Sequence, residues 1–201
     1  MAEFSQSNAL FIKFPYTADR EKSPWAGESV VPVSKLLGDN PARDYGVPLK
    51  GSTVIVCDWF GNDYNLRTDA KKGTPEVLKK LIDTVTKKAD DADKKLAKNY
   101  DKAAESHGKA DSKGSLKLLL RNFKEGYVGL PAQESSIRLY HEIMDATRKQ
   151  AEEMRDNGDE AGLKSLGKDF KGTDVEKDIA ECLKNIVRKA PADPTTQEKK
   201  R

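Results

Sequence analysis

The apolar residues of this chain follow two different patterns, one on each side of about residue 73. From Thr74 onward they recur every three or four positions, which is the period of amphipathic helices. Before Gly73 they gather in short runs rich in valine, isoleucine and aromatic residues, which is typical of strands. The pattern predicts an α+β chain that is mainly α-helical, with a small N-terminal strand-and-loop part.

The longest helix is expected from Thr74 to about Glu105. Thr74 can cap it, and Pro75 suits the first position, where a missing amide donor costs nothing. At 1.5 Å per residue this helix is about 45 Å long, so it must form a hairpin with a neighbour or project from a small core. Its apolar stripe has near-heptad spacing, and we expect an interface with another helix along Leu78, Ile82, Val85, Ala89, Ala92 and Leu96.

Four more helices are expected in the C-terminal part. The first covers 115–126 and the second covers about 134–157, each stopped by a glycine. A weak helix follows at 161–166, and the last begins at a capping box formed by Thr173 and Glu176. With the long helix, these segments predict a bundle of about five helices.

Three strands are expected in the N-terminal part, at Ala9–Phe14, Ser29–Val33 and Ser52–Phe60. Pro32 restricts the second to the edge of a sheet, because proline cannot donate to the ladder. Within the third, the run at 54–57 has no polar alternation, which indicates burial on both faces. A sheet this thin needs helices packed on it to be stable.

The composition also changes near Gly73. Nine of the fourteen aromatic residues, including both tryptophans, precede it. We therefore expect three parts: an aromatic-rich strand-containing part at 1–73, a helical bundle at 74–190 and a basic tail at 191–201.

Charge and cysteine content restrict the environment. Lysine and arginine number 36 against 33 acidic residues, a net charge of +3 that is too small for bulk attraction to nucleic acid. The only two cysteines are Cys57 and Cys182, and we expect each to be a buried free thiol rather than part of a disulfide framework. No apolar stretch approaches the roughly 20 residues that span a bilayer, and the N-terminus lacks the basic start of a signal peptide. We expect a cytoplasmic protein with no membrane contact.

Nucleic-acid binding would therefore require a local patch, and one segment offers it. Within this segment only Asp111 opposes the basic residues, which are Lys109, Lys113, Lys117, Arg121 and Lys124. The last four fall on one side of a helix and could hold phosphates. On the long helix, by contrast, acid–base pairs four residues apart, such as Asp83–Lys87 and Asp90–Lys94, are expected to neutralise their own face.

The N-terminal aromatic residues allow two interpretations. On a sheet beside a positive groove they could stack on the bases of a single strand, whereas core packing of a small domain explains most of them with no ligand. The residues concerned are Phe11, Phe14, Tyr16, Trp25, Trp59, Phe60 and Tyr64.

Catalytic chemistry has one candidate position. Asp58 and Asp63 follow the third expected strand across a turn, and two carboxylates there could share Mg²⁺. The segment CDWFGND matches no nuclease or phosphotransfer motif, and Asp and Asn are ordinary turn formers. His141 and Asp145 lie four apart on a helix, but no second histidine has metal-ligand spacing. We expect no metal and no cofactor, and these observations favour a role without catalysis over an enzymatic one.

These observations favour a non-catalytic protein-interaction or assembly component that acts through amphipathic helices, with a protein partner or self-association. The first alternative is a nucleic-acid-binding protein that uses the basic 109–124 segment and the N-terminal aromatics. The second is a metal-dependent enzyme at Asp58 and Asp63.

Overall fold

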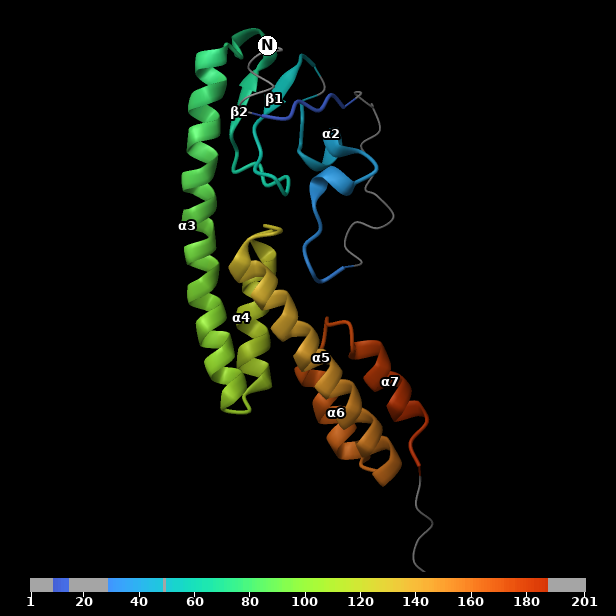
Figure 1. Cartoon of the computed structure of the whole chain (residues 1–201). Coiled ribbons are helices and arrows are strands. Elements are labelled where there is room, and N and C mark those ends of the chain that lie inside the picture. The colour runs from blue at the N-terminus through green and yellow to red at the C-terminus, as the bar shows by residue number, and fades with distance from the viewer. Residues whose placement is uncertain (1–8, 15–28, 49, 188–201) are drawn as a thin grey trace, which may run out of the picture. The chain divides into compact units, whose positions relative to one another are not determined.

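The structure is a computed structural model that describes residues 9–14, 29–48 and 50–187. Helices dominate these residues, and the strands form one small antiparallel sheet (Figure 1). The chain divides into two compact units, Met1–Tyr140 and His141–Arg201. The mainly helical α+β class predicted from the apolar pattern is confirmed.

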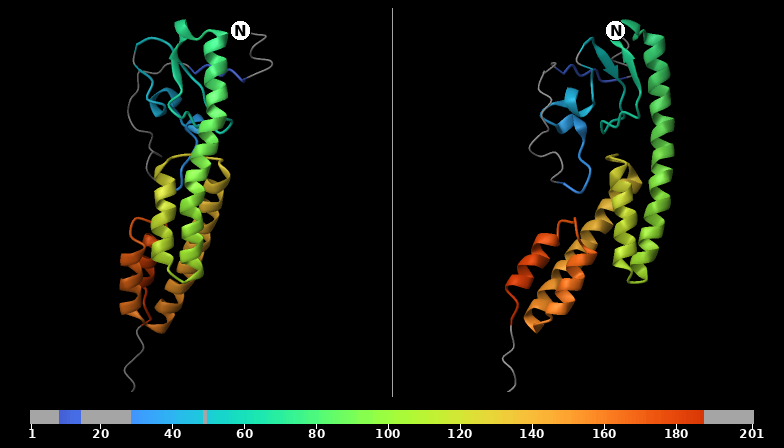
Figure 2. Two further views of the ribbon diagram at one scale, coloured as in Figure 1. Left: turned by 90° about the vertical axis from the view of Figure 1, so that its left-hand side faces the viewer. Right: turned by 180° about the vertical axis from the view of Figure 1, so that it is seen from behind.

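The sheet consists of β1 (Thr53–Ile55) and β2 (Arg67–Asp69), with Val54 opposite Thr68. Pairing continues past the strands, where the amide of Val56 donates to the carbonyl oxygen of Leu66 at 2.9 Å. The sheet lies beside the N-terminal half of the long helix α3 (Figure 2). The loop at 56–66 between the two strands carries the candidate site.

The predicted strands are largely wrong. Ala9–Phe14 and Ser29–Val33 form no strand, and only Thr53–Ile55 of the predicted Ser52–Phe60 is a strand. The run at 54–57 is half-buried rather than buried on both faces, because among the described residues the sheet has two strands. β2 was missed because its sequence, Arg-Thr-Asp, has no apolar residue.

Helix α3 (Pro75–Gly108) confirms the longest predicted helix. Thr74 Oγ1 accepts a hydrogen bond from the amide of Val77, and Pro75 occupies the first turn. At 34 residues the helix is about 51 Å long. Of the predicted apolar stripe, Ile82 and Ala89 are half-buried. The buried residues of the helix follow the stripe and are Leu78, Val85, Ala92, Leu96 and Ala103.

The chain's own residues cover the α3 stripe. Val85, Ala92 and Leu96 share a core cluster with two residues of the 56–66 loop, Tyr64 and Leu66. Helix α4 (Ser112–Lys124) turns back after α3 and packs along it as a hairpin (Figure 1). The stripe thus packs inside the chain, and its buried members are not presented to a partner.

A buried polar contact crosses three helices of the first unit. Asn122 on α4 is fully buried, and its Nδ2 donates to the Leu96 carbonyl oxygen at 3.0 Å and to Ser136 Oγ at 2.9 Å. Asn99 Nδ2 of α3 donates to Asn122 Oδ1 at 2.8 Å. These bonds satisfy the buried amide and tie α3, α4 and the start of α5 (Pro131–Asn157) together.

The second unit contains the last part of α5, α6 (Glu160–Asp169) and α7 (Glu176–Lys184). Its core is formed by residues from these helices and the turn before α7, namely Met144, Ala151, Leu163, Leu166, Val175, Ile179 and Cys182. The helices at 134–157 and 161–166 were predicted with bounds a few residues too short.

The predicted capping box at the last helix is wrong. Thr173 Oγ1 donates to the Phe170 carbonyl oxygen at 2.6 Å, and the amide of Glu176 donates to the backbone carbonyl oxygen of Thr173 at 3.2 Å rather than to its hydroxyl. Glu176 Oε2 accepts from the amide of Gly172, and Val175 at the N-cap position makes no side-chain bond. The helix ends at Lys184, and the predicted tail at 191–201 lies outside the described residues. None of the helices in the described ranges is long and apolar enough to cross a bilayer.

Candidate functional site

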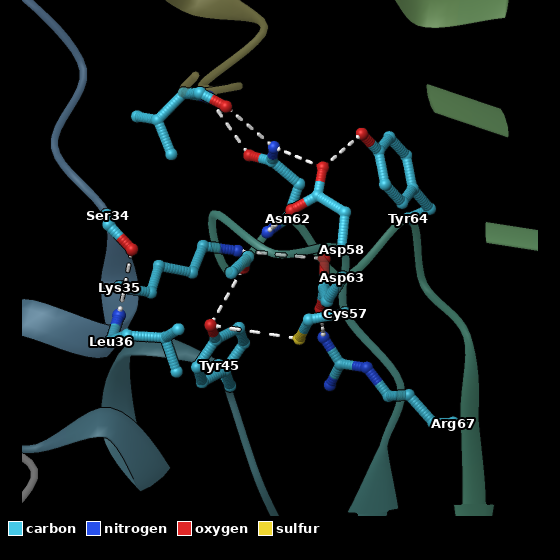
Figure 3. Close-up of polar contacts among 12 residues, drawn as sticks. Ser34, Lys35, Leu36, Tyr45, Cys57, Asp58, Asn62, Asp63, Tyr64 and Arg67 are labelled. Carbon is cyan, nitrogen blue, oxygen red and sulfur yellow. Dashed lines mark hydrogen bonds and ion pairs between the residues drawn. The ribbon is translucent and has the colours of Figure 1, made fainter. Parts of the chain in front are cut away.

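Asp58 organises the 56–66 loop through hydrogen bonds to both of its carboxylate oxygens (Figure 3). Oδ1 accepts from the amides of Phe60 at 2.9 Å and Asn62 at 3.0 Å. Oδ2 accepts from Asn62 Nδ2 and from the Tyr64 hydroxyl, each at 2.7 Å. Four donors converge on one carboxylate, so Asp58 closes the turn upon itself.

Asn62 joins this turn to the loop between α4 and α5. Its side chain is buried, and its Nδ2 donates to the Val128 carbonyl oxygen at 2.8 Å as well as to Asp58. The amide of Val128 donates back to Asn62 Oδ1 at 3.0 Å. The paired bonds imitate a short β-bridge and attach the turn to the helical part of the first unit (Figure 3).

Tyr45, which follows the short helix α2 (Pro41–Asp44), supports the other side of the turn. Its hydroxyl donates to the Gly61 carbonyl oxygen at 2.7 Å and accepts a weak bond from Cys57 Sγ at 3.8 Å. Burial raises the pKa of Tyr45 and of the Cys57 thiol. Burial, and then the bond to the Asp58 carboxylate, raises the pKa of Tyr64. All three groups therefore stay protonated and act as donors at neutral pH.

Asp63 has different partners from Asp58. Arg67 Nη2 lies 2.5 Å from its Oδ2, and Lys35 Nζ lies 3.9 Å from its Oδ1 (Figure 3). The two carboxylates proposed as a shared metal site are thus each bonded to the chain's own donors. Nowhere in the described ranges do three or more His, Cys, Asp or Glu side chains group to hold a metal ion. The bonds of the Asp58 and Asp63 carboxylates hold the turn in one shape.

The closed turn presents two aromatic side chains to solvent. Trp59 is 84% exposed and Phe60 is 45% exposed. Gly61 has φ +89, and a Cβ there would lie 2.7 Å from Leu36 Cγ, so both conformation and space require glycine. The Phe60 ring lies against Gly129, whose missing Cβ makes room for it.

Two further apolar side chains are exposed next to this turn. Ser34 Oγ donates to the Phe60 carbonyl oxygen at 2.7 Å, which holds the segment 33–37, including the 3₁₀ turn η1 (Lys35–Leu37), against it. On this segment Val33 is 62% exposed and Leu37 is 79% exposed. We call Val33, Leu37, Trp59 and Phe60 the apolar patch.

Core packing does not account for most of the N-terminal aromatics. Tyr64 is buried, but Phe11, Phe14, Trp59 and Phe60 are each at least 40% exposed. Tyr16 and Trp25 lie outside the described residues. The signal for the apolar patch was a tryptophan placed between the aspartate and the glycine of a predicted turn, a position that faces water.

The predicted basic segment divides between two helices. Lys113, Lys117, Arg121 and Lys124 lie on the exposed face of α4. Lys109 caps the end of α3 instead, and its Nζ lies 2.6 Å from Glu105 Oε1. In the part of the chain that the structure describes, Lys117, Arg121 and Lys124 belong to none of the ion pairs.

The other charged candidates have local partners. Asp145 is paired with Arg148 at 2.8 Å on α5. Lys95 on α3 bonds Glu125 at 2.8 Å across the hairpin. That bond occupies the acidic residue next to the end of α4 and leaves the basic face of α4 uncompensated there.

No protein-family model, no curated protein and no solved structure matches the chain.

Proposed function

We propose that the protein is a non-catalytic protein-interaction or assembly component, and that it contacts a protein partner through the apolar patch. The observation that carries this proposal is the exposure of Trp59, 84%, on a turn whose polar groups are bonded inside the chain. A large aromatic side chain held out in water by a closed turn contributes nothing to the core. It is available for a partner.

The energetics support a contact centred on Trp59. Covering the exposed 84% of a tryptophan of roughly 200 Å², at about 25 cal/mol per Å², is worth on the order of 4 kcal/mol. The Asp58 bonds and the Asn62–Val128 pair already hold the turn, so binding orders little of the backbone. Tryptophan is among the residues most enriched at binding hot spots.

This proposal moves the contact surface from the long helix to the loop. The α3 stripe is covered by Tyr64, Leu66 and α4, so the helices serve as the scaffold that positions the 56–66 loop.

Quantitative affinity enrichment tests the proposal. Tagged full-length wild type, Trp59→Ser and Val77→Ser are used as baits in an extract of cells that express the protein. Val77 is also an exposed apolar residue, at 37%, but it lies on α3. We expect proteins that wild type and Val77→Ser retain equally and Trp59→Ser loses by about tenfold or more. The same enriched proteins with all three baits would refute the proposal.

Nucleic-acid binding is the second candidate, and the basic face of α4 favours it. Lys117, Arg121 and Lys124 are exposed, and Asp111 is used as the cap of α4, where its Oδ1 accepts from the amide of Gly114. Cations at this spacing neutralise phosphates only if no acid competes for them. Binding of labelled single strands that weakens steeply with salt would support this candidate.

A further inference from the structure

The end of α5 carries the chain's only asparagine that is followed by a glycine, Asn157–Gly158. Asn157 is the last residue of the helix and is exposed. Within the part of the chain that the structure describes, its side-chain amide takes part in none of the hydrogen bonds or ion pairs. Glycine has no side chain to obstruct its own backbone nitrogen, so that nitrogen can reach the carboxamide carbon of the residue before it. The pair is therefore suited to spontaneous deamidation.

A Schellman cap holds the backbone around this pair. The amide of Gly158 donates to the carbonyl oxygen of Arg155 at 3.1 Å, and the amide of Asp159 donates to the carbonyl oxygen of Met154 at 2.8 Å. Gly158 has φ +73, the left-handed conformation that this cap requires. The nitrogen that would attack Asn157 is thus bonded elsewhere, and the helical conformation of Asn157 keeps it away from the carboxamide.

The segment that follows α7 closes over this cap. The amide of Val187 also donates to the carbonyl oxygen of Arg155, at 3.1 Å. A Cβ at Gly158 would lie 2.8 Å from the carbonyl oxygen of Val187, so the two backbones are in close contact. Opening the end of α5 therefore requires the backbone at Val187 to move as well.

We propose that Asn157 is a site of spontaneous modification whose rate is controlled by the cap and by Val187. When the end of α5 opens, the backbone nitrogen of Gly158 loses its proton and attacks the carboxamide carbon of Asn157. The bond from that carbon to the side-chain nitrogen breaks, ammonia leaves and a cyclic succinimide forms. Water then opens the ring at either carbonyl and leaves an aspartate or an isoaspartate at position 157. The reaction consumes only water, and nothing is oxidised or reduced.

The product opposes the cap that delayed its formation. A carboxylate at position 157 lies at the negative end of the α5 dipole, close in sequence to Asp156 and Asp159. An isoaspartate also adds a methylene group to the backbone, which alters the bond spacing of the cap. Conversion is therefore expected to loosen the bond from Val187 to Arg155. The reaction uses residues of the second unit alone, so it stands or fails separately from the proposed function.

Peptide mapping of the full-length protein measures the reaction. The folded chain and the chain unfolded in guanidinium chloride are incubated in the same mildly alkaline buffer. The tryptic peptide 156–164 is then separated into its asparagine, aspartate and isoaspartate forms. We expect conversion in both samples, but more slowly in the folded chain because its cap must open first. No conversion in the folded chain would overturn the site, and equal rates would overturn its control by the cap.

Variants at Val187 test the part played by the segment after α7. Val187→Pro removes the N–H that bonds the Arg155 carbonyl oxygen, whereas Val187→Ala keeps it. In the folded state we expect Val187→Pro to deamidate about two- to tenfold faster than Val187→Ala, the range that one hydrogen bond supplies. Equal rates in these two variants would refute control by Val187.

Variants at Asn157 test the effect of the product. Asn157→Asp carries the charge of the product, and Asn157→Gln keeps a neutral carboxamide. Hydrogen exchange of the Val187 amide, followed by NMR, should be about two- to fivefold faster in Asn157→Asp than in Asn157→Gln. Indistinguishable exchange would mean that conversion leaves the bond to Arg155 intact, and this part of the proposal would be wrong.

Discussion

The hydroxyl of Tyr64 donates to Oδ2 of Asp58 at 2.7 Å, and this bond joins the two ends of the loop that carries Trp59. Tyr64 also stacks on Tyr127, with ring centroids 5.3 Å apart, and belongs to the core cluster along α3. One side chain thus connects the exposed turn to the buried face of the long helix. The shape of the turn therefore depends on the helical core.

Replacing Asp58 by Asn should destabilise the fold measurably without involving a metal. Asn offers one acceptor and one donor where the carboxylate accepts four donors, so at least one buried donor loses its partner. We expect a loss of about 1–3 kcal/mol in the free energy of unfolding by urea denaturation, against about 0.5 kcal/mol or less for Asp101→Asn on the exposed face of α3. A rise in thermal stability with Mg²⁺ that disappears in Asp58→Asn would contradict this and restore the metal-site hypothesis.

Stability should fall above about pH 10, in part through Tyr45 and Tyr64. The folded-state pKa of both phenols is raised above that of an unfolded tyrosine. They stay protonated in the folded chain while the unfolded chain ionises, so stability that is complete below about pH 10 is lost as pH rises. Each contributes up to about 1.4 kcal/mol per pH unit.

The double variant Tyr45→Phe/Tyr64→Phe isolates this contribution. It is less stable at neutral pH because three hydrogen bonds are lost, one of them the weak bond from Cys57, but its stability should fall less steeply above about pH 10. Urea denaturation midpoints measured over a pH series from neutral to strongly alkaline provide the two curves. Parallel curves would mean that these phenols do not titrate differently in the folded and unfolded chains.

A charge placed in the α3 stripe should lower the free energy of unfolding, and the loss should be larger where the replaced residue is more deeply buried. Ala92 is buried and Ala89 is half-buried, so Ala92→Glu should lose about 3 kcal/mol or more and Ala89→Glu less. Thr86→Glu, on the exposed side of the same helix, should change stability by about 0.5 kcal/mol or less. Thermal denaturation of the three variants gives the order, and equal effects at Ala92 and Thr86 would contradict the packing.

If the basic face of α4 holds phosphates, charge reversal there should abolish binding of labelled single-stranded nucleic acid. Lys117→Glu/Arg121→Glu should lose affinity by a factor of about 10² or more at low salt with little change in thermal stability. Lys87→Glu/Lys94→Glu reverses two exposed charges on α3 and should lose much less. Equal losses in both double variants would indicate diffuse attraction rather than a site.

The helices could be predicted because their signals are local and repeat over many residues. Thr74, Pro75 and the spacing of Leu78, Val85 and Leu96 identify α3 without knowledge of its neighbours. The capping box at Thr173 failed because the same residue types also form the turn that ends α6, where Thr173 bonds Phe170.

The strands and the candidate site could not be predicted in the same way. A strand needs a partner, and β2 (Arg67–Asp69) pairs through its backbone with no apolar side chain to mark it. Asp58 was recognised as a turn residue, but its bonds to Asn62 and Tyr64, and the bridge from Asn62 to Val128, depend on contacts up to 66 positions apart. Periodicity carries no information about such contacts.

The buried amide of Asn122 opposes sliding of the two helices of the hairpin along each other. Sliding α4 along α3 by one turn, about 5.4 Å, would break its bonds to Leu96 and Asn99 and leave a polar side chain against leucines. The buried amide therefore fixes the register of α4 against α3.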